Sequence, residues 1–310
     1  MSISKHIQLP ALLCLFLAVL YGCSEEIEVH TKSMDRTYLV VEAMLTDRAD
    51  VHQSVRLTES VDYFELGPPP VVSGAVVTVS DGSQVWHFSE YPEGSGCYIG
   101  PDGFCGTPGN TYELEIDASV GGARNHYEAV STMEEPGFEV TAVDYMYLGK
   151  PGALLDSLWS IALWGEDLPG TNYFMTGSAL NGAVFPISFS VCMDDKYFSG
   201  QKVVCFPITT LNQTEAMRKR YGDCCKYLET GDIITFTVYT VPKEYYTFYT
   251  GFVSSSVGAS IPMLQSQPAN CPTNIKGGDA MGYFVACSSS SASVVIEDPL
   301  RPYYQKALPL

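Results

Sequence analysis

Apolar and polar residues alternate in short segments through most of the chain from about residue 38 onward. A period of two places alternate side chains on one face, which is the pattern of a half-buried β-strand. Gly, Pro, Asn and Asp separate the segments, as expected of turns. The strands predicted from these patterns cover residues 38–45, 54–57, 75–79, 112–116, 126–130, 138–143, 158–164, 172–176, 232–239 and 281–286.

Two segments depart from this alternation and predict short helices. Residues 242–253 start with a proline and an acidic residue in the first turn, followed by aromatic residues at helical spacing. We interpret this aromatic stripe as core packing rather than a ligand-binding face. Residues 214–221 are a second helix candidate, and their three basic residues are most simply a solvated face.

The order of these elements predicts a mostly β protein with two β-sandwich-like domains and one or two short helices in the second. Aromatic residues make up 12% of the chain, with 20 tyrosines, 27 glycines and 19 prolines, and this composition suits an exported all-β protein. The predicted divisions are a tether over 23–35, an N-terminal sandwich over 36–133, a second β-rich domain over 134–300 and a C-terminal tail over 301–310.

The first 22 residues have the layout of a secretory signal peptide. A basic residue, Lys5, precedes an apolar run over 12–20 that is too short for a spanning helix. The run ends in Leu20-Tyr21-Gly22-Cys23, which predicts cleavage before Cys23 and lipidation of its thiol. Several acyl chains tether a protein durably, whereas one chain binds a membrane only marginally. Ordinary secretion with an incidental cysteine is the alternative.

Acidic residues follow Cys23 and dominate the mature chain. The sequence Ser24-Glu25-Glu26 resembles the signal that sends lipoproteins of the Bacteroidota to the outer face of the outer membrane. Removal of Lys5 with the signal leaves 16 basic against 35 acidic residues, a formal charge of −19. Nucleic acid is therefore a poor partner. An acidic docking surface and simple solubility explain this charge equally well.

Eight cysteines remain once Cys14 is removed with the signal and Cys23 is lipidated. An even number in an exported chain predicts disulfides. Cys97 and Cys105 flank a loop rich in Gly and Pro and are the expected pair, whereas the adjacent Cys224 and Cys225 are expected to bond to different partners. The pairing of the rest is open. The candidates are Cys97, Cys105, Cys192, Cys205, Cys224, Cys225, Cys271 and Cys287.

The sequence gives no local sign of a catalytic site, a cofactor site or a metal site. It lacks a Gly-x-Ser-x-Gly elbow, a His-Glu-x-x-His motif, a phosphate-binding loop and a Cys-x-x-Cys pair. Calcium binding at Asp194-Asp195 or at Asp81-Gly82-Ser83 is possible in principle, but turns explain both better. Trp86, Trp159 and Trp164 could form a sugar-binding platform, although core packing is the more common role.

The most distinctive segment is an ordered loop that leads into a strand. It reads Pro268-Ala269-Asn270-Cys271-Pro272-Thr273-Asn274-Ile275-Lys276-Gly277-Gly278, followed by Gly282-Tyr283-Phe284. Such a loop could present a ligand, but a rigid connector is the simpler interpretation. With the segments 38–46, 55–58, 68–75, 107–112 and 232–239, it resembles the Bacteroidota lipoproteins grouped as domain of unknown function 4249, over nearly all of the mature chain.

This resemblance implies a two-domain surface lipoprotein whose N-terminal sandwich is similar to carboxypeptidase-regulatory or transthyretin-like modules. Members are often encoded beside TonB-dependent receptors, and the resemblance carries no catalytic residues. We therefore expect a non-enzymatic lipoprotein on the outer-membrane surface, acting as an accessory binding or scaffold subunit of a TonB-dependent transporter. The alternatives are a free-standing adhesin or glycan binder and, less favoured, a hydrolase of exported polymers.

Overall fold

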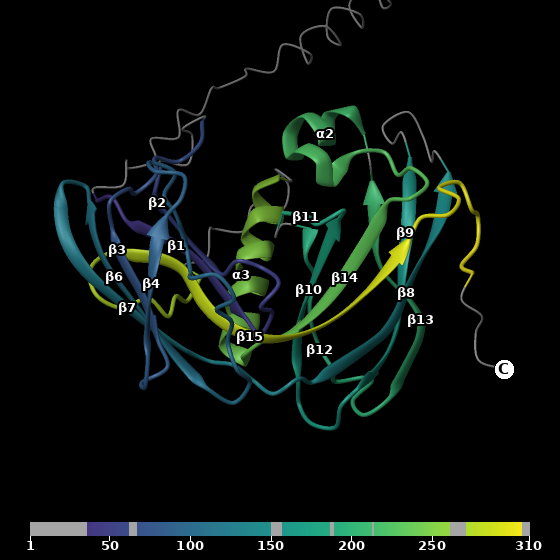
Figure 1. Ribbon diagram of the computed structural model, residues 1–310, viewed down its shortest axis with the longest axis horizontal. Helices are drawn as coiled ribbons and strands as arrows, with labels where there is room; N and C mark the ends of the chain where they lie inside the picture. The colour runs from purple at the N-terminus through teal and green to yellow at the C-terminus, as the bar shows by residue number, and fades with distance from the viewer. Residues whose placement is uncertain are drawn as a thin grey trace, which may run out of the picture. The chain divides into compact units, whose positions relative to one another are not determined.

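Strands dominate the part of the chain that the computed structural model describes, which is residues 36–61, 67–149, 157–186, 189–212, 214–260 and 271–305 (Figure 1). The alternation in the sequence becomes one-sided burial: in β6, Leu114 and Ile116 are buried between exposed Glu113 and Glu115. The first seven strands are β1 (Leu39–Thr46), β2 (Ser54–Glu59), β3 (Val76–Ser80), β4 (Val85–Glu90), β5 (Cys97–Ile99), β6 (Thr111–Val120) and β7 (Ala123–Thr132).

The remaining elements combine longer strands with two α-helices and a 3-10 turn. They are β8 (Phe138–Gly149), β9 (Leu158–Asp167), β10 (Tyr173–Leu180), β11 (Ala183–Val184), β12 (Cys192–Asp194), β13 (Lys202–Asn212), α2 (Glu215–Tyr221), η2 (Gly222–Cys225), β14 (Ile233–Thr240), α3 (Lys243–Ser260) and β15 (Ala280–Val295).

One strand, β15, links the two halves of the fold. A 12-stranded sheet runs in the order β11-β10-β14-β15-β1-β2-β5-β4-β3-β6-β7, with β12 beside β10, and a second sheet has the order β13-β9-β8. Residues 280–287 of β15 pair in parallel with β1, and residues 288–295 pair antiparallel with β14. The larger sheet therefore continues from the N-terminal strands into the C-terminal ones through β15 (Figure 1).

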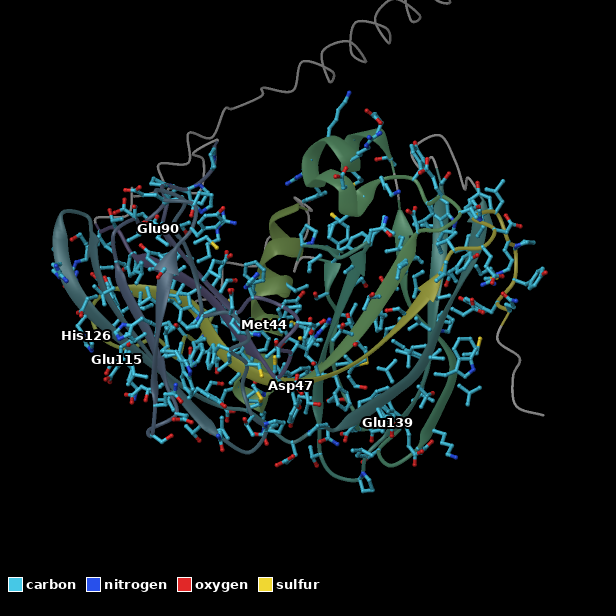
Figure 2. The ribbon with its side chains drawn as sticks, in the orientation of Figure 1. Met44, Asp47, Glu90, Glu115, His126 and Glu139 are labelled. Atoms are coloured by element: carbon cyan, nitrogen blue, oxygen red, sulfur yellow. The ribbon has the colours of Figure 1, made fainter. Side chains whose placement is uncertain are left out.

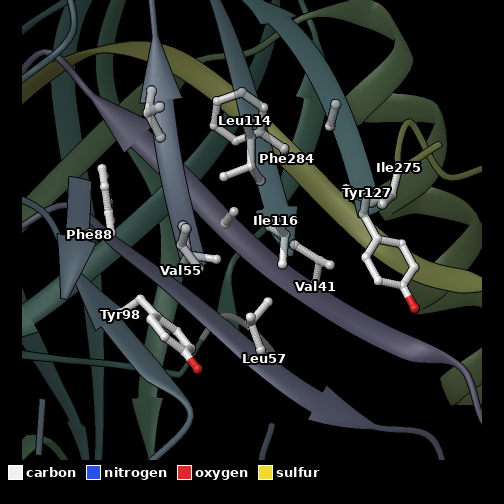
Figure 3. Close-up of a cluster of buried hydrophobic side chains, with 14 of the residues drawn as sticks. Val41, Val55, Leu57, Phe88, Tyr98, Leu114, Ile116, Tyr127, Ile275 and Phe284 are labelled. Carbon is white, nitrogen blue, oxygen red and sulfur yellow. The ribbon is translucent and has the colours of Figure 1, made fainter. Parts of the chain in front are cut away.

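The first hydrophobic cluster lies inside the N-terminal strands (Figure 3). Val41, Leu57 and Ile116 are almost completely buried there. Ile275 and Phe284 join them from the far end of the sequence. The cluster thus seals the N-terminal sandwich with residues that lie far beyond it in the sequence.

A second cluster fills the space between the three-stranded sheet and the strands β10, β14 and the end of β15. Tyr145, Ile161, Phe174 and Phe236 are among its most deeply buried members. This arrangement is a second sandwich, because the inner faces of the two sheets bury each other's apolar side chains.

A third cluster lies on the other face of β15, where α3 covers the sheet. Tyr283 and Cys287 of β15 point to this cluster, whereas Phe284 between them points to the first cluster. Tyr245 of α3 packs on Tyr283 with ring centroids 5.3 Å apart. The middle of β15 is therefore buried on both faces.

Side chains at the end of β1 support the same face of the sheet (Figure 2). Met44 packs against the third cluster, and Asp47 accepts a 2.6 Å hydrogen bond from the Ser289 hydroxyl. Glu115 and Glu139, in contrast, are exposed on β6 and β8. The exposed acids fit the large negative charge of the sequence.

The predicted fold class is confirmed, because the structure is mostly β with a sandwich-like arrangement and two short α-helices. Helix α2 matches the predicted segment 214–221, and Thr214 caps it by accepting from the Met217 amide at 3.1 Å. Helix α3 was expected to end at 253 but continues to Ser260. The expected domain boundary falls between β7 and β8, although the two halves share β15.

The start of the predicted C-terminal tail packs against the three-stranded sheet. Arg301 is buried and forms an ion pair with Asp144 of β8. Its guanidinium also lies 4.0 Å from the centre of the Tyr145 ring. Tyr304 donates a 2.6 Å hydrogen bond to Ser160 of β9. Residues 301–305 are thus part of the fold.

Candidate ligand pocket

An apolar pocket of about 230 Å³ opens within the C-terminal sandwich. It lies between the three-stranded sheet and the strands β10, β12 and β14. Phe138 and Phe174 are buried at its wall, whereas Val204 and Phe206 of β13 are about 39% and 48% exposed. The lining residues are Phe138, Leu163, Phe174, Thr176, Met193, Phe198, Val203, Val204, Phe206, Ile208 and Val238.

The shape of the pocket depends on an irregularity in β13. The register between β13 and β9 shifts between Val203 and Phe206, and Cys205 has a positive φ of 49°. A β-bulge of this kind re-aims side chains relative to the regular alternation. As a result, the neighbouring Val203 and Val204 both line the pocket, together with Phe206.

The chemistry of the lining is that of a binding site for an uncharged apolar group. Thr176 supplies the one hydroxyl among the lining side chains, and it accepts a 2.8 Å hydrogen bond from the Val191 amide. None of the lining side chains ionises near neutral pH. For comparison, an apolar cavity of about 150 Å³ accepts benzene. The pocket therefore has room for an aromatic or branched aliphatic side chain.

A buried carboxylate lies at the end of β9, where Asp167 pairs with the pocket residue Phe138. Asp167 is 1% exposed, and its Oδ2 accepts a 2.8 Å hydrogen bond from the Gly200 amide. Its Oδ1 has no hydrogen-bond partner within the described residues. Burial and then the nearby Asp195 raise the pKa of Asp167 above its usual value. Burial thus makes the charged form of the Asp167 side chain costly.

The cysteines predicted to form disulfides are dispersed over the fold. Cys97 and Cys105 are half-buried thiols, so their predicted pairing stays a prediction. Cys192 and Cys287 belong to the third cluster, and Cys271 lies against Gly251 of α3. Cys205, Cys224 and Cys225 are thiols as well. Cys23, the predicted lipidation site, lies outside the described residues together with the rest of the predicted signal and tether up to residue 35.

The tryptophans do not gather into a sugar-binding platform. Trp159 and Trp164 of β9 are 2% and 5% exposed. Trp86 belongs to the first cluster, where its ring lies 4.4 Å from that of Phe104. The three side chains are thus divided between the two sandwiches and serve as packing groups.

The two candidate calcium segments form turns and structural contacts. Asp81 accepts hydrogen bonds from the amides of Ser83 and Gln84, as in an Asx turn. Asp195 accepts from the backbone and side-chain amides of Asn172. Among the residues that the structure describes, no group of three or more His, Cys, Asp or Glu side chains could hold a metal ion.

The distinctive loop before β15 acts as a clamp between β15 and β7. The Asn274 amide nitrogen donates to the carbonyls of Phe284 at 2.8 Å and Val130 at 3.1 Å. Its amide oxygen accepts from the Phe284 amide at 3.0 Å. Ile275 then enters the first cluster beside Tyr127 (Figure 3). The asparagine therefore satisfies backbone groups that two strands would otherwise leave unpaired.

Glycines let the clamp approach its neighbours closely. A Cβ on Gly277 would lie 2.3 Å from the His126 carbonyl oxygen. A Cβ on Gly282 would lie 2.0 Å from the Val41 carbonyl oxygen, and Gly282 has a φ of +90°. Side chains at these positions are excluded by both contact and conformation. The connector interpretation of this motif accounts for its asparagine, its isoleucine and its glycines.

Three further findings concern the helices, the curated proteins and the protein families. None of the helices in the described ranges is long and apolar enough to cross a membrane. No curated protein matches the chain. The model of the family described as domain of unknown function DUF4249 matches residues 24–293, and the chain therefore belongs to that family.

Proposed function

We propose that this chain is a lipid-anchored lipoprotein of the Bacteroidota outer membrane that serves as an accessory binding or scaffold subunit of a TonB-dependent transporter. Cys23 carries the anchor, and the folded body displays a binding pocket at the cell surface. The partly exposed apolar pocket of the C-terminal sandwich is the observation that carries the binding role. The protein recruits its partner without catalysing a reaction.

The position of Cys23 supports the tethered arrangement. The predicted anchor precedes Arg36, the first described residue, by 13 positions. A chain of this length spans at most about 47 Å when fully extended. Tethering at this distance keeps the folded body next to a membrane partner and raises the effective concentration of each for the other. Weak contacts then suffice for a durable complex.

The pocket supports insertion of an apolar side chain from the partner. Interfaces obtain much of their binding energy from aromatic or aliphatic anchors in well-packed pockets. Phe206 and Val204 are exposed at β13, which is an edge strand of its sheet. An anchor side chain entering beside them would bury these exposed surfaces together with the apolar pocket lining.

The experiment is affinity purification of the tagged full chain from detergent-solubilised outer membranes. We expect a large β-barrel receptor to co-purify with the wild-type chain, and Phe206→Glu to reduce its yield at least tenfold because a carboxylate enters an apolar contact. Tyr91→Glu is the matched control, since Tyr91 is 73% exposed and far from the pocket in the sequence. Purification of the wild-type chain alone would contradict the proposal.

The anchor is tested separately by metabolic labelling with palmitate. The wild-type chain is expected to incorporate the label and to be degraded by protease added to intact cells. Cys23→Ser is expected to lose the label. A labelled chain that is protected from protease in intact cells would place it on the inner side of the membrane and refute surface display.

A further inference from the structure

The adjacent cysteines of η2 contact each other inside the C-terminal sandwich. The Sγ atoms of Cys224 and Cys225 are 3.8 Å apart. The two residues are 3% and 2% exposed and belong to the second hydrophobic cluster. The Cys224 thiol also donates to the Tyr221 carbonyl oxygen at 3.2 Å. Two thiols thus face each other inside an apolar cluster.

The other cysteines occupy different environments. The sequence alone favours separate partners for Cys224 and Cys225, and such pairing would have to bring distant sulfurs into the second cluster. Cys97 lies opposite Arg56 in the pairing of β5 with β2, and Cys105 follows Phe104 in a loop. Cys192 and Cys287 belong to the third cluster, and Cys271 lies beside α3. Cys205 lies near Asp144 and Tyr304.

We propose that Cys224 and Cys225 form a vicinal disulfide with each other and constitute a redox-sensitive modification site. The oxidant is a disulfide, either a small molecule or a disulfide-exchange protein. The thiolate of one cysteine attacks the oxidant and releases one thiol, which leaves a mixed disulfide. The second cysteine attacks the sulfur of the first cysteine in this mixed disulfide and releases the second thiol of the oxidant. The oxidant thereby gains the two protons and two electrons that the cysteine pair loses.

The surroundings favour a neutral disulfide over a thiolate site for a metal. Burial, followed by the contact with Cys224, raises the pKa of Cys225 to about 12. A metal-bound thiolate would need the charged form in this apolar cluster, whereas a disulfide carries no charge and needs no hydrogen-bond partner. The same raised pKa makes the exchange slow, since the thiolate is the attacking species.

The covalent geometry makes this disulfide readily reducible. Consecutive Cα atoms are about 3.8 Å apart across a trans peptide. Ordinary disulfides have Cα atoms about 4.4–6.8 Å apart, and shorter spacings store strain. Strained disulfides have more oxidising potentials and are the labile ones. The pair therefore opens in mildly reducing conditions and closes again when a disulfide oxidant is present.

Trypsin provides a direct test, because it cleaves after Arg220 and after Lys226. The peptide Tyr221–Lys226 contains Cys224 and Cys225 and no other cysteine. The full chain is incubated with oxidised glutathione and then unfolded in denaturant with iodoacetamide present, so that every remaining thiol is alkylated. It is then digested and analysed by mass spectrometry. We expect this peptide to be two hydrogen atoms lighter than its dithiol form and to accept iodoacetamide only after reduction.

Two other results would overturn the proposal. One is a doubly alkylated peptide without prior reduction after prolonged incubation with the oxidant. The other is a cross-link from this peptide to a peptide that contains a different cysteine. As a control, Cys97→Ser must leave the vicinal disulfide unchanged. A Cys224–Cys225 disulfide that stays oxidised at equilibrium in the most reducing glutathione buffer would refute the claim that this disulfide is readily reduced.

Discussion

Removal of the Asn274 side chain tests whether the family loop stabilises the fold as a clamp. Asn274→Ala deletes three hydrogen bonds to the backbones of Val130 and Phe284. Each such bond contributes about 1 kcal/mol net, with additional cost where a buried backbone group is left unpaired. Phe284 is 1% exposed, so water cannot readily replace its lost partners. The expected loss in the free energy of unfolding is about 3 kcal/mol.

The assay is equilibrium unfolding of the purified chain in urea, followed by circular dichroism. With a slope of about 3 kcal/mol per M, the loss lowers the midpoint by about 1 M. Asn274→Asp has the same shape and retains the acceptor for the Phe284 amide, but it replaces the donor with an oxygen that faces two carbonyls. We therefore expect it to be at least as destabilising as the alanine variant.

Asn125→Ala is the matched control. Asn125 lies in β7 and its side-chain amide nitrogen makes an exposed contact of 3.4 Å to the Ala123 carbonyl oxygen. The expected change is within about 0.5 kcal/mol. If Asn274→Ala changes the free energy of unfolding by no more than this control, the clamp does not stabilise the fold and the physical account of the motif is refuted.

Three further substitutions test other parts of the structure by the same urea assay. Gly282→Ala should destabilise the chain by more than about 3 kcal/mol, because its Cβ would collide with the Val41 carbonyl, and a loss below about 1 kcal/mol would refute the close approach. Asp167→Asn should stabilise the chain at pH 7 and change its stability little below pH 3.8. Because the folded state raises the pKa of Asp167 above 3.8, the wild-type chain loses stability as the pH rises from 3.8 through the folded pKa. A variant that keeps the pH dependence of the wild-type chain would contradict this. Arg301→Met should lower the free energy of unfolding by about 3–5 kcal/mol, because it removes the cation that pairs with buried Asp144. Adding Asp144→Leu should recover part of this free energy. No recovery in the double variant would argue against the ion pair as the cause.

The fold class and most strands were predictable because alternation survives in the structure as one-sided burial. The short strands β4, β5, β11 and β12 were not predicted, and β13 and the second half of β15 lack the alternation altogether. Strand β13 contains Pro207, which argues against a central strand, and the structure places β13 at the edge of its sheet with an irregular register there. The end of β15 is a run of serines, and it forms a strand because β14 pairs with it.

The candidate pocket was beyond the reach of the sequence. Its lining comes from strands between Phe138 and Val238, and only the packing of two sheets brings these residues together. The bulge at Cys205 that shapes it has no glycine to mark it. The clamp is an intermediate case, because Asn274 and its glycines signal an ordered loop, whereas the strands that they contact depend on the tertiary fold.

Site-specific photo-crosslinking from position 206 tests the central claim most directly. A photoreactive phenylalanine analogue replaces Phe206 in cells, the cells are irradiated, and the cross-linked products are identified by mass spectrometry; the same analogue at position 91 is the control. The account predicts a cross-link from position 206 to an apolar side chain of a TonB-dependent β-barrel receptor and none from position 91. Cross-links from position 206 only to lipid, glycan or other copies of this chain would contradict the accessory role.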